Sequence, residues 1–464
     1  MLNRDGLGYL CEWKARAHRK PLIIRGARQV GKSYLVRELL ATKEFLNIVE
    51  INFERQPEIA DIFAYREPDK IVKYLEVQTG EKIEDGKTLL FLDEIQAKPN
   101  VLATLRYFYE DRPGLHVIAA GSLLEFVLAE HEFSMPVGRV EYMYMEPLSF
   151  EEFLAAMKKE KLLSLIKSYG IGDEIPQSIH QELMGLVTEF WCVGGLPEAV
   201  EVYCQTHSFV EVERIQQSLI ATYMDDFSKY RRRVPLENLQ RVFQSIPRQI
   251  GEKFVYSEVS REIRSAELSK AVGLLSQALV MNRVNTSSGN GLPLGGEEKA
   301  NTFKAYCLDI GLCARQLGLS ISSLNIPIDV KFIANRGGFC EQYVAEMLKC
   351  AMPFYEEHEL YYWHREKYNS NAELDFLVQV GDEVIPVEVK AGTSGTMKSL
   401  HQFLIEKGRD FGLRFNGDLP SFISTKYKDI NGTEHPFRLL SLPFYMIGQY
   451  SRLVREAKNL SPRT

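Results

Sequence analysis

Gly26-Ala27-Arg28-Gln29-Val30-Gly31-Lys32-Ser33 is the stretch that decides the fold of the first part of the chain. A short apolar run precedes it at residues 21–24 and a segment with helical character follows at residues 34–40, so we expect a buried strand, a loop and a helix. The glycines allow the backbone to curl around a phosphate group with successive N–H groups pointing inward. The N-terminus of the helix adds positive partial charge. The pattern predicts a phosphate-binding loop, or P-loop, to which all eight residues contribute.

Two side chains of the P-loop have defined chemistry. Lys32 is expected to reach the β- and γ-phosphates of a nucleoside triphosphate, and Ser33 is expected to ligate Mg²⁺. The alternative is a glycine-containing turn before an ordinary helix. However, a chance match to the whole spacing arises in only about one or two per cent of chains of this length. ATP and Mg²⁺ are therefore the predicted cofactors.

A second apolar run, residues 88–92, ends in Asp93 and Glu94. Such a run is typical of a strand buried in a parallel sheet, and ligands bind beyond the carboxyl ends of those strands. Asp93 would hold Mg²⁺ through water, and Glu94 would act as general base on the attacking water. The alternative is that both acids only cap the following segment.

A third apolar run, residues 117–120, ends in Gly121-Ser122, and Arg139 follows further along the chain. Ser122 could sense the γ-phosphate or cap a helix. Arg139 could stabilise charge on the transferring phosphoryl group, in its own chain or in a neighbouring subunit, or be an ordinary surface residue. Strand and helix patterns alternate between residues 22 and 145, which predicts an α/β fold with a parallel sheet and helices on both faces.

Composition narrows the class of protein. The 464 residues suffice for two to four domains of about 100–200 residues each. The net charge of −6 argues against a nucleic-acid coat over the whole surface. The seven cysteines form no C-x-x-C pair, so neither a zinc site nor a disulfide framework is predicted. With no signal peptide and no apolar segment long enough to span a bilayer, a cytoplasmic protein without a membrane partner is expected.

The middle of the chain is predicted to be largely helical. Residues 149–152 form a capping box, and the helical pattern of residues 181–223 is interrupted by Gly194-Gly195-Leu196-Pro197. The basic run 229–233 could contact a nucleic-acid backbone or be a solvated surface. Residues 250–310 follow the order helix, turn, helix, hairpin of a winged helix. For its second helix, protein packing is favoured at least as much as DNA binding.

Residues 373–380 and 383–390 are predicted to pair as a β-hairpin. Between them, Gly381-Asp382 is a two-residue turn signal with glycine first. The turn would pair Val380 with Glu383. Side chains alternate along a strand, so one face would carry apolar side chains, namely Leu374, Phe376, Val378, Val387 and Val389.

The other face of this hairpin gathers charge. Asp375 would lie opposite Glu388, and Glu373 opposite Lys390. Opposed Cβ atoms are only about 4.5–5.5 Å apart, and two carboxylates at that separation repel by roughly 3 kcal/mol at an effective dielectric near 20. A divalent cation would reverse the sign of this interaction.

That pairing predicts a metal site with Asp375 and Glu388 as ligands, and Glu341 is a candidate for a further ligand. Glu341 comes from a segment, residues 339–350, that has the pattern of an amphipathic helix. Lys390 would position or neutralise a phosphate, as phosphodiester hydrolysis requires. The alternative is a solvent-facing hairpin closed by a salt bridge, which Pro386 favours because proline cannot donate to the ladder.

Taken together, these motifs resemble a large family of poorly characterised prokaryotic AAA-type ATPases, almost from end to end. The C-terminal part also resembles the PD-(D/E)XK nuclease superfamily, in which an acid, then acid-x-Lys, and a glutamate on an earlier helix form the site. Asp375, Glu388, Lys390 and Glu341 match those positions, although the proline before the first aspartate is absent. The segments that carry the family resemblance are residues 26–33, 92–96, 121–122, 137–139, 147–152 and 194–197.

The resemblance implies a domain order. It places a P-loop AAA-type ATPase domain at residues 1–165 and a helical lid or linker at 166–235. A winged-helix-like region at 236–330 and a restriction-endonuclease-like α/β domain at 331–464 would follow.

Two functions remain as hypotheses. In the first, ATP binding and hydrolysis, with Lys32, Glu94 and Arg139 as catalytic residues, drive a C-terminal domain that cuts or binds DNA or RNA, with Lys390 as its catalytic lysine. In the second, the chain is a nucleotide-gated protein-interaction module whose nuclease-like domain is inactive. A metabolic kinase ranks below both, by analogy between folds. AAA-type proteins often form rings, so a homo-oligomer is expected from the resemblance, although no residue here predicts one.

Overall fold

The computed structural model describes residues 2–121, 136–230, 233–297, 302–319, 337–367, 370–391, 397–429 and 432–460. The chain divides into two compact units. The N-terminal unit comprises Met1–Pro147, Gln277–Leu279 and Met352–His358. The C-terminal unit comprises Leu148–Ser276, Val280–Ala351 and Glu359–Thr464. Within the described ranges, no helix combines the length and apolar character needed to cross a membrane.

A five-stranded sheet forms the centre of the N-terminal unit. Its order is β2-β3-β4-β1-β5, and every neighbouring pair is parallel. β3 is buried along its whole length, as its continuous apolar run requires. The predicted parallel sheet is thereby confirmed. The strands are β1 (Leu22–Arg25), β2 (Asn47–Asn52), β3 (Thr88–Asp93), β4 (His116–Ala120) and β5 (Glu141–Tyr144).

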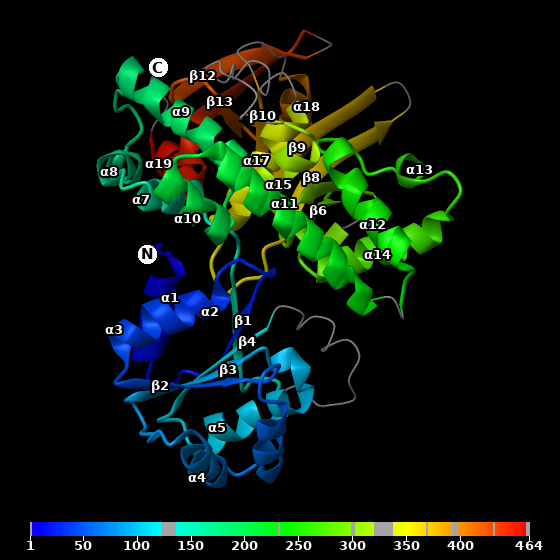
Figure 1. Ribbon diagram of the computed structural model, residues 1–464. Helices are drawn as coiled ribbons and strands as arrows, with labels where there is room; N and C mark the ends of the chain where they lie inside the picture. The colour runs from blue at the N-terminus through cyan, green and yellow to red at the C-terminus, as the bar shows by residue number, and fades with distance from the viewer. Residues whose placement is uncertain are drawn as a thin grey trace. The chain divides into compact units, whose positions relative to one another are not determined.

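Helices cover both faces of this sheet (Figure 1). On one side lie α1 (Gly6–Ala15), α2 (Lys32–Tyr34) and α3 (Thr42–Glu44), and on the other α4 (Pro68–Thr79) and α5 (Leu105–Asp111). α2 runs directly into a π-helical segment, Leu35–Ala41, whose Leu35, Val36, Leu39 and Leu40 are buried. Three 3₁₀ segments lie between the helices and strands of the described part of this unit, at Pro57–Tyr65, Ile95–Ala97 and Pro99–Thr104.

The C-terminal unit begins with helices. The predicted capping box starts the first of them, because Ser149 Oγ accepts from the N–H of Glu152 while the Glu152 carboxylate accepts from the N–H of Ser149. The helical pattern predicted for residues 181–223 forms three helices, which are separated at the glycine pair before Pro197 and again at residues 207–208. The helices are α7 (Phe150–Ala156), α8 (Glu160–Ser168), α9 (Gln177–Val193), α10 (Pro197–Thr206), α11 (Phe209–Asp226), α12 (Leu236–Ser245), α13 (Tyr256–Val259) and α14 (Ser265–Gln277).

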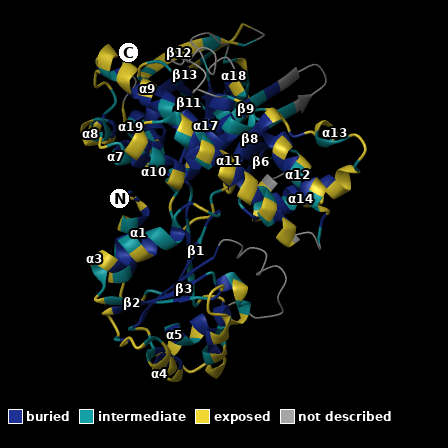
Figure 2. Cartoon of the chain, in the orientation of Figure 1, coloured by how far each residue is buried: buried dark blue, intermediate teal, exposed yellow. Residues whose placement is uncertain are grey.

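An eight-stranded mixed sheet follows, in the order β12-β13-β11-β10-β9-β8-β6-β7. Figure 2 shows the buried interior of this unit in dark blue. Four further helices accompany the sheet, α15 (Ile310–Gln316), α17 (Gly337–Cys350), α18 (Lys398–Lys407) and α19 (Tyr450–Asn459). The strands are β6 (Met281–Thr286), β7 (Phe303–Cys307), β8 (Leu360–Lys367), β9 (Ser370–Val380), β10 (Glu383–Val389), β11 (Phe411–Asn416), β12 (Ser421–Lys428) and β13 (Glu434–Pro443).

The segment predicted as a winged helix does not stand apart from the segment predicted as nuclease-like. β6 and β7 form an antiparallel hairpin as expected, but β6 also pairs in parallel with β8, Val284 opposite Leu360. Residues 236–330 and 331–464 therefore share one sheet, in contrast to the division expected from the resemblance. The pattern of a hairpin indicates its turn and its two strands, but it does not indicate whether an outer edge pairs with a third strand.

Candidate functional site

The P-loop curls tightly because two of its residues adopt left-handed backbone conformations. Gln29 has a φ of 65° and Gly31 a φ of 90°, which glycine adopts easily and other residues seldom adopt. Gly26 has no room for a side chain, since a Cβ there would overlap the carbonyl oxygen of Met145. Gly31 is the N-cap of α2, so the loop ends at a helix N-terminus as predicted.

Lys32 lies folded into the loop. Its Nζ donates to the carbonyl oxygens of Gly26 and Ala27 at 2.9 and 2.7 Å, and the residue is only 8% exposed. Burial lowers the pKa of Lys32 to about 8, against the opposing effect of Glu94 and Asp93. A phosphate group would stabilise this buried ammonium in its charged form. The residues of the loop therefore fit a bound nucleotide.

Ser33 and Asp93 meet across the site from separate elements. The Ser33 hydroxyl lies 3.1 and 3.0 Å from the two carboxylate oxygens of Asp93, which is 4% exposed. Burial raises the pKa of Asp93, and the bond from Ser33 opposes this. Hydroxyl and carboxylate oxygens are suitable Mg²⁺ ligands. The pair predicted to hold the metal is thus brought together.

Glu94 follows β3 in a strained conformation. Its φ of 50° is in the left-handed region, an uncommon state that costs energy in residues other than glycine. The side-chain amide of Gln96 donates to the Glu94 carboxylate, while Gln96 Oε1 is buried without a hydrogen-bond partner in the part of the chain that the structure describes. In the sequence, Gln96 belongs to the motif at residues 92–96, and the motif alone assigns it no role. Its amide fixes the acid predicted to act as general base.

Of the other two predicted residues of the nucleotide site, the structure describes only Arg139, which is paired away from the P-loop. Arg139 donates to the carboxylate of Glu110 in α5 at 2.8 Å, and its side chain is 42% exposed. Ser122 lies outside the described residues, directly after Gly121 at the end of β4. A Cβ at Gly121 would overlap Gln96 Oε1, so a larger residue there would displace that amide.

The second group of predicted residues converges on a lysine that the sequence did not single out. Lys304 Nζ in β7 lies 2.6 Å from Glu373, 3.0 Å from Glu341 and 3.9 Å from Asp375, and its side chain is 0% exposed. The hydroxyl of Tyr306 donates to the same Glu341 oxygen at 2.8 Å. We call these residues, together with Glu388 and Lys390, the acidic cluster.

The predicted hairpin register is confirmed over its paired length. Val380 pairs with Glu383, and the pairing continues to Phe376 with Val387. The N–H of Val389 donates to Asp375 Oδ2 at 2.6 Å. Pro386 lies in an interior strand, directly before the residues of β10 that pair with β11. The ladder with β11 begins only at Val387, directly after the proline.

A bulge in β9 changes the faces predicted for this hairpin. Tyr361 and Trp363 of β8 pair with Leu377 and Leu374, so three steps along β9 match two along β8. Leu374 and Leu377 consequently share one apolar cluster, whereas the ring of Phe376 lies 6.1 Å from that of Tyr306. A bulge re-aims side chains and is common next to functional sites.

Charge within the acidic cluster is unevenly balanced. Lys390 Nζ lies 2.5 Å from Glu388 Oε1, whereas Glu388 Oε2 is buried with no hydrogen-bond partner among the described atoms. Burial, reinforced by Glu341, raises the pKa of Asp375 well above its usual range. Burial also raises the pKa of Glu388, with Lys390 opposing it. Four carboxylates thus share two lysines.

The cluster is not arranged as a metal centre in this structure. Across the described ranges, no group of three or more His, Cys, Asp and Glu side chains is placed to hold a metal ion. Instead, three carboxylates point to the Lys304 ammonium. The sequence signal that could have indicated Lys304 is a lysine inside the strand-like run 303–307. In the structure every residue of this strand is buried.

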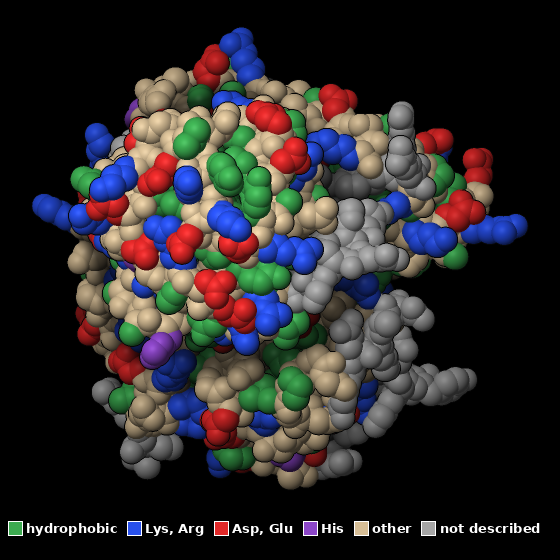
Figure 3. Space-filling view, turned by 90° about the horizontal axis from the view of Figure 1, so that it is seen from below, with side chains coloured by type: hydrophobic (Ala, Val, Ile, Leu, Met, Phe, Trp, Pro, Cys, Tyr) green, Lys and Arg blue, Asp and Glu red, His purple; other side chains and the backbone are tan. Residues whose placement is uncertain are grey.

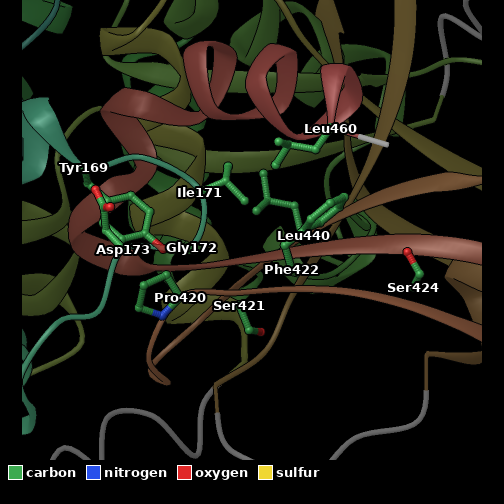
Figure 4. A pocket seen from close by; sticks show the side chains of 10 residues that line it. All are labelled: Tyr169, Ile171, Gly172, Asp173, Pro420, Ser421, Phe422, Ser424, Leu440 and Leu460. Carbon is green, nitrogen blue, oxygen red and sulfur yellow. The ribbon is translucent and has the colours of Figure 1, made fainter. Parts of the chain in front are cut away.

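A separate pocket of about 380 Å³ lies in the C-terminal unit (Figure 4). None of the predicted site residues lines it. Its lining comes from the loop after α8, from β12 and β13 and from the end of α19, with Asp173 as the charged member and Tyr169, Ile171, Phe422, Leu440 and Leu460 among the others.

Comparison with protein families matches three parts of the chain. Residues 18–154 match the model of an AAA domain. Residues 184–323 and 336–426 match two models that are each described as a domain of unknown function, DUF8612 and DUF4143. No curated protein matches the chain.

Several solved structures are similar at low identity. The Walker-type ATPase of Pyrococcus abyssi is 16% identical over 68% of this chain and 96% of that one, with a TM-score of 0.44. The Aeropyrum pernix ORC2 protein, solved as ADPNP–ADP complexes, is 12% identical over 68% and 90%, with a TM-score of 0.33. These scores are too low to support a conclusion about this chain. The family match, together with the P-loop and the parallel sheet, identifies residues 18–154 as an AAA-type P-loop domain.

Proposed function

We propose that the N-terminal unit binds ATP with Mg²⁺ and hydrolyses it. The observation that carries this proposal is the buried Lys32 ammonium, enclosed by the P-loop beside the Ser33–Asp93 contact. Lys32 and the loop N–H groups would bind the phosphates. Ser33 and Asp93 would hold the metal, which when bound neutralises charge on the phosphate oxygens.

Glu94 would act as general base in this proposal. Its carboxylate is oriented by the Gln96 amide, and the unpartnered Gln96 oxygen could accept from a water next to the acid. Arg139 would stabilise the transferring phosphoryl group only after leaving its pair with Glu110. That exchange could follow contact with a neighbouring copy of the chain.

The test is Mg²⁺-dependent phosphate release and ATP binding by the full chain. Lys32→Ala should lose both, because no other described lysine lies inside the loop. Lys43→Ala, at an exposed lysine in α3, is the matched control and should retain both. Equal ATP binding by the wild type and Lys32→Ala would contradict the proposal.

For the C-terminal unit we propose a nuclease-like role on DNA or RNA that depends on a divalent cation. The support is the convergence of Glu341, Asp375 and Glu388 with Lys390, in an order that resembles the PD-(D/E)XK pattern. The acidic cluster contains four carboxylates and only two lysines, so negative charge remains that a divalent cation would neutralise. Figure 3 shows acidic and basic side chains interspersed on the face of the molecule that it draws.

The second candidate is a nucleotide-gated protein-interaction module with an inactive nuclease-like domain. The specific observation in its favour is Lys304, whose ammonium already occupies the centre of three carboxylates. Because the Lys304 ammonium already supplies positive charge to these carboxylates, the domain would fold without a metal ion.

One assay separates the two candidates. Binding and cleavage of single- and double-stranded DNA and RNA are measured with and without ATP and Mn²⁺, for the wild type, Asp375→Ala and Asp382→Ala. Asp382, in the exposed hairpin turn, is the control. Cleavage that only Asp375→Ala abolishes supports the nuclease role. No binding and no cleavage by the wild type supports the interaction module.

A further inference from the structure

The residues that follow β5 touch the P-loop on one side. The N–H of Met145 donates to the carbonyl of Arg25, directly before the loop, at 2.9 Å, and the Met145 carbonyl fills the space that a side chain at Gly26 would need. Arg4, only 7% exposed, adds a second link. Its guanidinium donates to the carbonyl of Val30 at 2.7 Å and to that of Glu146 at 2.8 Å.

Tyr144, the last residue of β5, and Glu146 after it also contact the segment Met352–His358. The N–H of Tyr144 donates to the carbonyl of Phe354 at 2.7 Å. His358 Nδ1 lies 3.0 Å from the Glu146 carboxylate, and the His358 side chain is only 3% exposed. This segment is part of the N-terminal unit, although the chain reaches it from α17 and leaves it into β8.

The segment is anchored on α1 as well. The ring of Phe354 lies 5.8 Å from that of Tyr9, and a Cβ at Gly6 would come into van der Waals contact with it. The segment Met352–His358, from the second half of the chain, therefore holds residues 144–146 in place. Those residues in turn hold the backbone of the P-loop at Gly26 and Val30. α17 carries Glu341, and β8 pairs with the strand that carries Glu373 and Asp375.

We infer that His358 is a positioning residue of the nucleotide site, acting through Glu146 and Arg4 on the backbone of the P-loop. The contacts run without a break from His358 to the Glu146 carboxylate, and from the Glu146 carbonyl through Arg4 to Val30. A conformational change of the P-loop backbone is thereby transmitted to Met352–His358, the segment that joins α17 to β8. The inference rests on the proposed ATP binding for its ligand, but the loop contacts exist without one.

The experiment compares four full-length proteins. These are the wild type, His358→Leu, His358→Asn and His435→Leu. An Asn amide nitrogen can take the place of His Nδ1 and donate to Glu146, so His358→Asn tests for rescue. His435 pairs with Asp429 at 3.2 Å in the C-terminal unit and is the matched His–carboxylate control.

Two readouts are measured, the ATP dissociation constant and hydrogen exchange of the P-loop amides without nucleotide. His358→Leu should weaken ATP binding by about three- to tenfold and speed exchange in the loop. His358→Asn should restore both, and His435→Leu should change neither. If His358→Leu lowers the unfolding midpoint but leaves ATP binding and loop exchange as in the wild type, the inference is overturned. If the wild type binds no ATP, the proposed function fails, and loop exchange still decides this inference.

Discussion

Replacing Lys304 with methionine removes the cation at the centre of the acidic cluster while keeping its length and apolar stem. Nζ lies within 2.6–3.9 Å of three carboxylates and the side chain is 0% exposed. Removing one partner from a buried ionic group costs about 3–5 kcal/mol. Glu373 is 35% exposed and can turn towards water, so we expect about 4 kcal/mol rather than the upper end of that range.

The assay is thermal unfolding of the full chain with and without Mn²⁺. At about 2–4 °C per kcal/mol for large domains, the midpoint of the C-terminal unit should fall by roughly 8–16 °C. Mn²⁺ at one hundred times its dissociation constant should return about 2.7 kcal/mol. The rise with Mn²⁺ should be larger in Lys304→Met than in the wild type, because the metal replaces the missing charge.

Lys390→Met is the matched control for this experiment. Lys390 has one carboxylate partner, and its side chain is 24% exposed, so its loss should cost less than half as much. A midpoint for Lys304→Met within about 1 °C of the wild type would refute the electrostatic account. So would a response to Mn²⁺ no larger than that of the wild type.

Three further predictions concern other sites. Gln96→Leu should lower the ATPase turnover number by about tenfold or more, because Glu94 loses its orienting amide. The ATP affinity should stay unchanged, and a titration that shows ATP affinity falling as much as turnover would contradict this prediction. Gly26→Ala should abolish ATP binding, since its Cβ would displace Met145, and calorimetry checks this. Burial raises the pKa of Asp309 from 3.8 to about 6, so the folded state binds this proton more tightly than the unfolded state does. The free energy of unfolding should therefore fall as pH rises from about 3.8 to about 6. Denaturant unfolding across that window should show a decline that Asp309→Asn lacks.

Local sequence predicted the strand, the loop and the helix start of the P-loop. The strand, loop and helix around residues 26–33 lie next to one another in the chain, so spacing alone indicates their geometry. The Ser33–Asp93 contact followed because parallel strands end at the same edge of a sheet. Arg139 depends on a surface partner, Glu110, which no motif indicates. The role of Gln96 depends on its side-chain conformation beside Gly121.

The acidic cluster was predicted only in part. A two-residue turn fixes hairpin register, so Val380 and Glu383 could be paired from the sequence. The bulge beside Asp375 could not be foreseen, because alternation along a strand has no signal for an extra residue. Lys304 was missed for another reason. It reaches the cluster from a strand on the far edge of the sheet, and strand order is not encoded in local periodicity.

The continuity of the eight-stranded sheet has a consequence for how this half of the chain can evolve. The two domains of unknown function cover residues 184–323 and 336–426, yet β6 in the first is hydrogen-bonded to β8 in the second, and β13 lies beyond both. A gene fusion or exchange that transferred only one of the two domains would remove the hydrogen-bonded pairing of β6 with β8. The edges of both strands would then be unpaired, and unpaired strand edges promote aggregation. We therefore expect the two to be inherited as a single module.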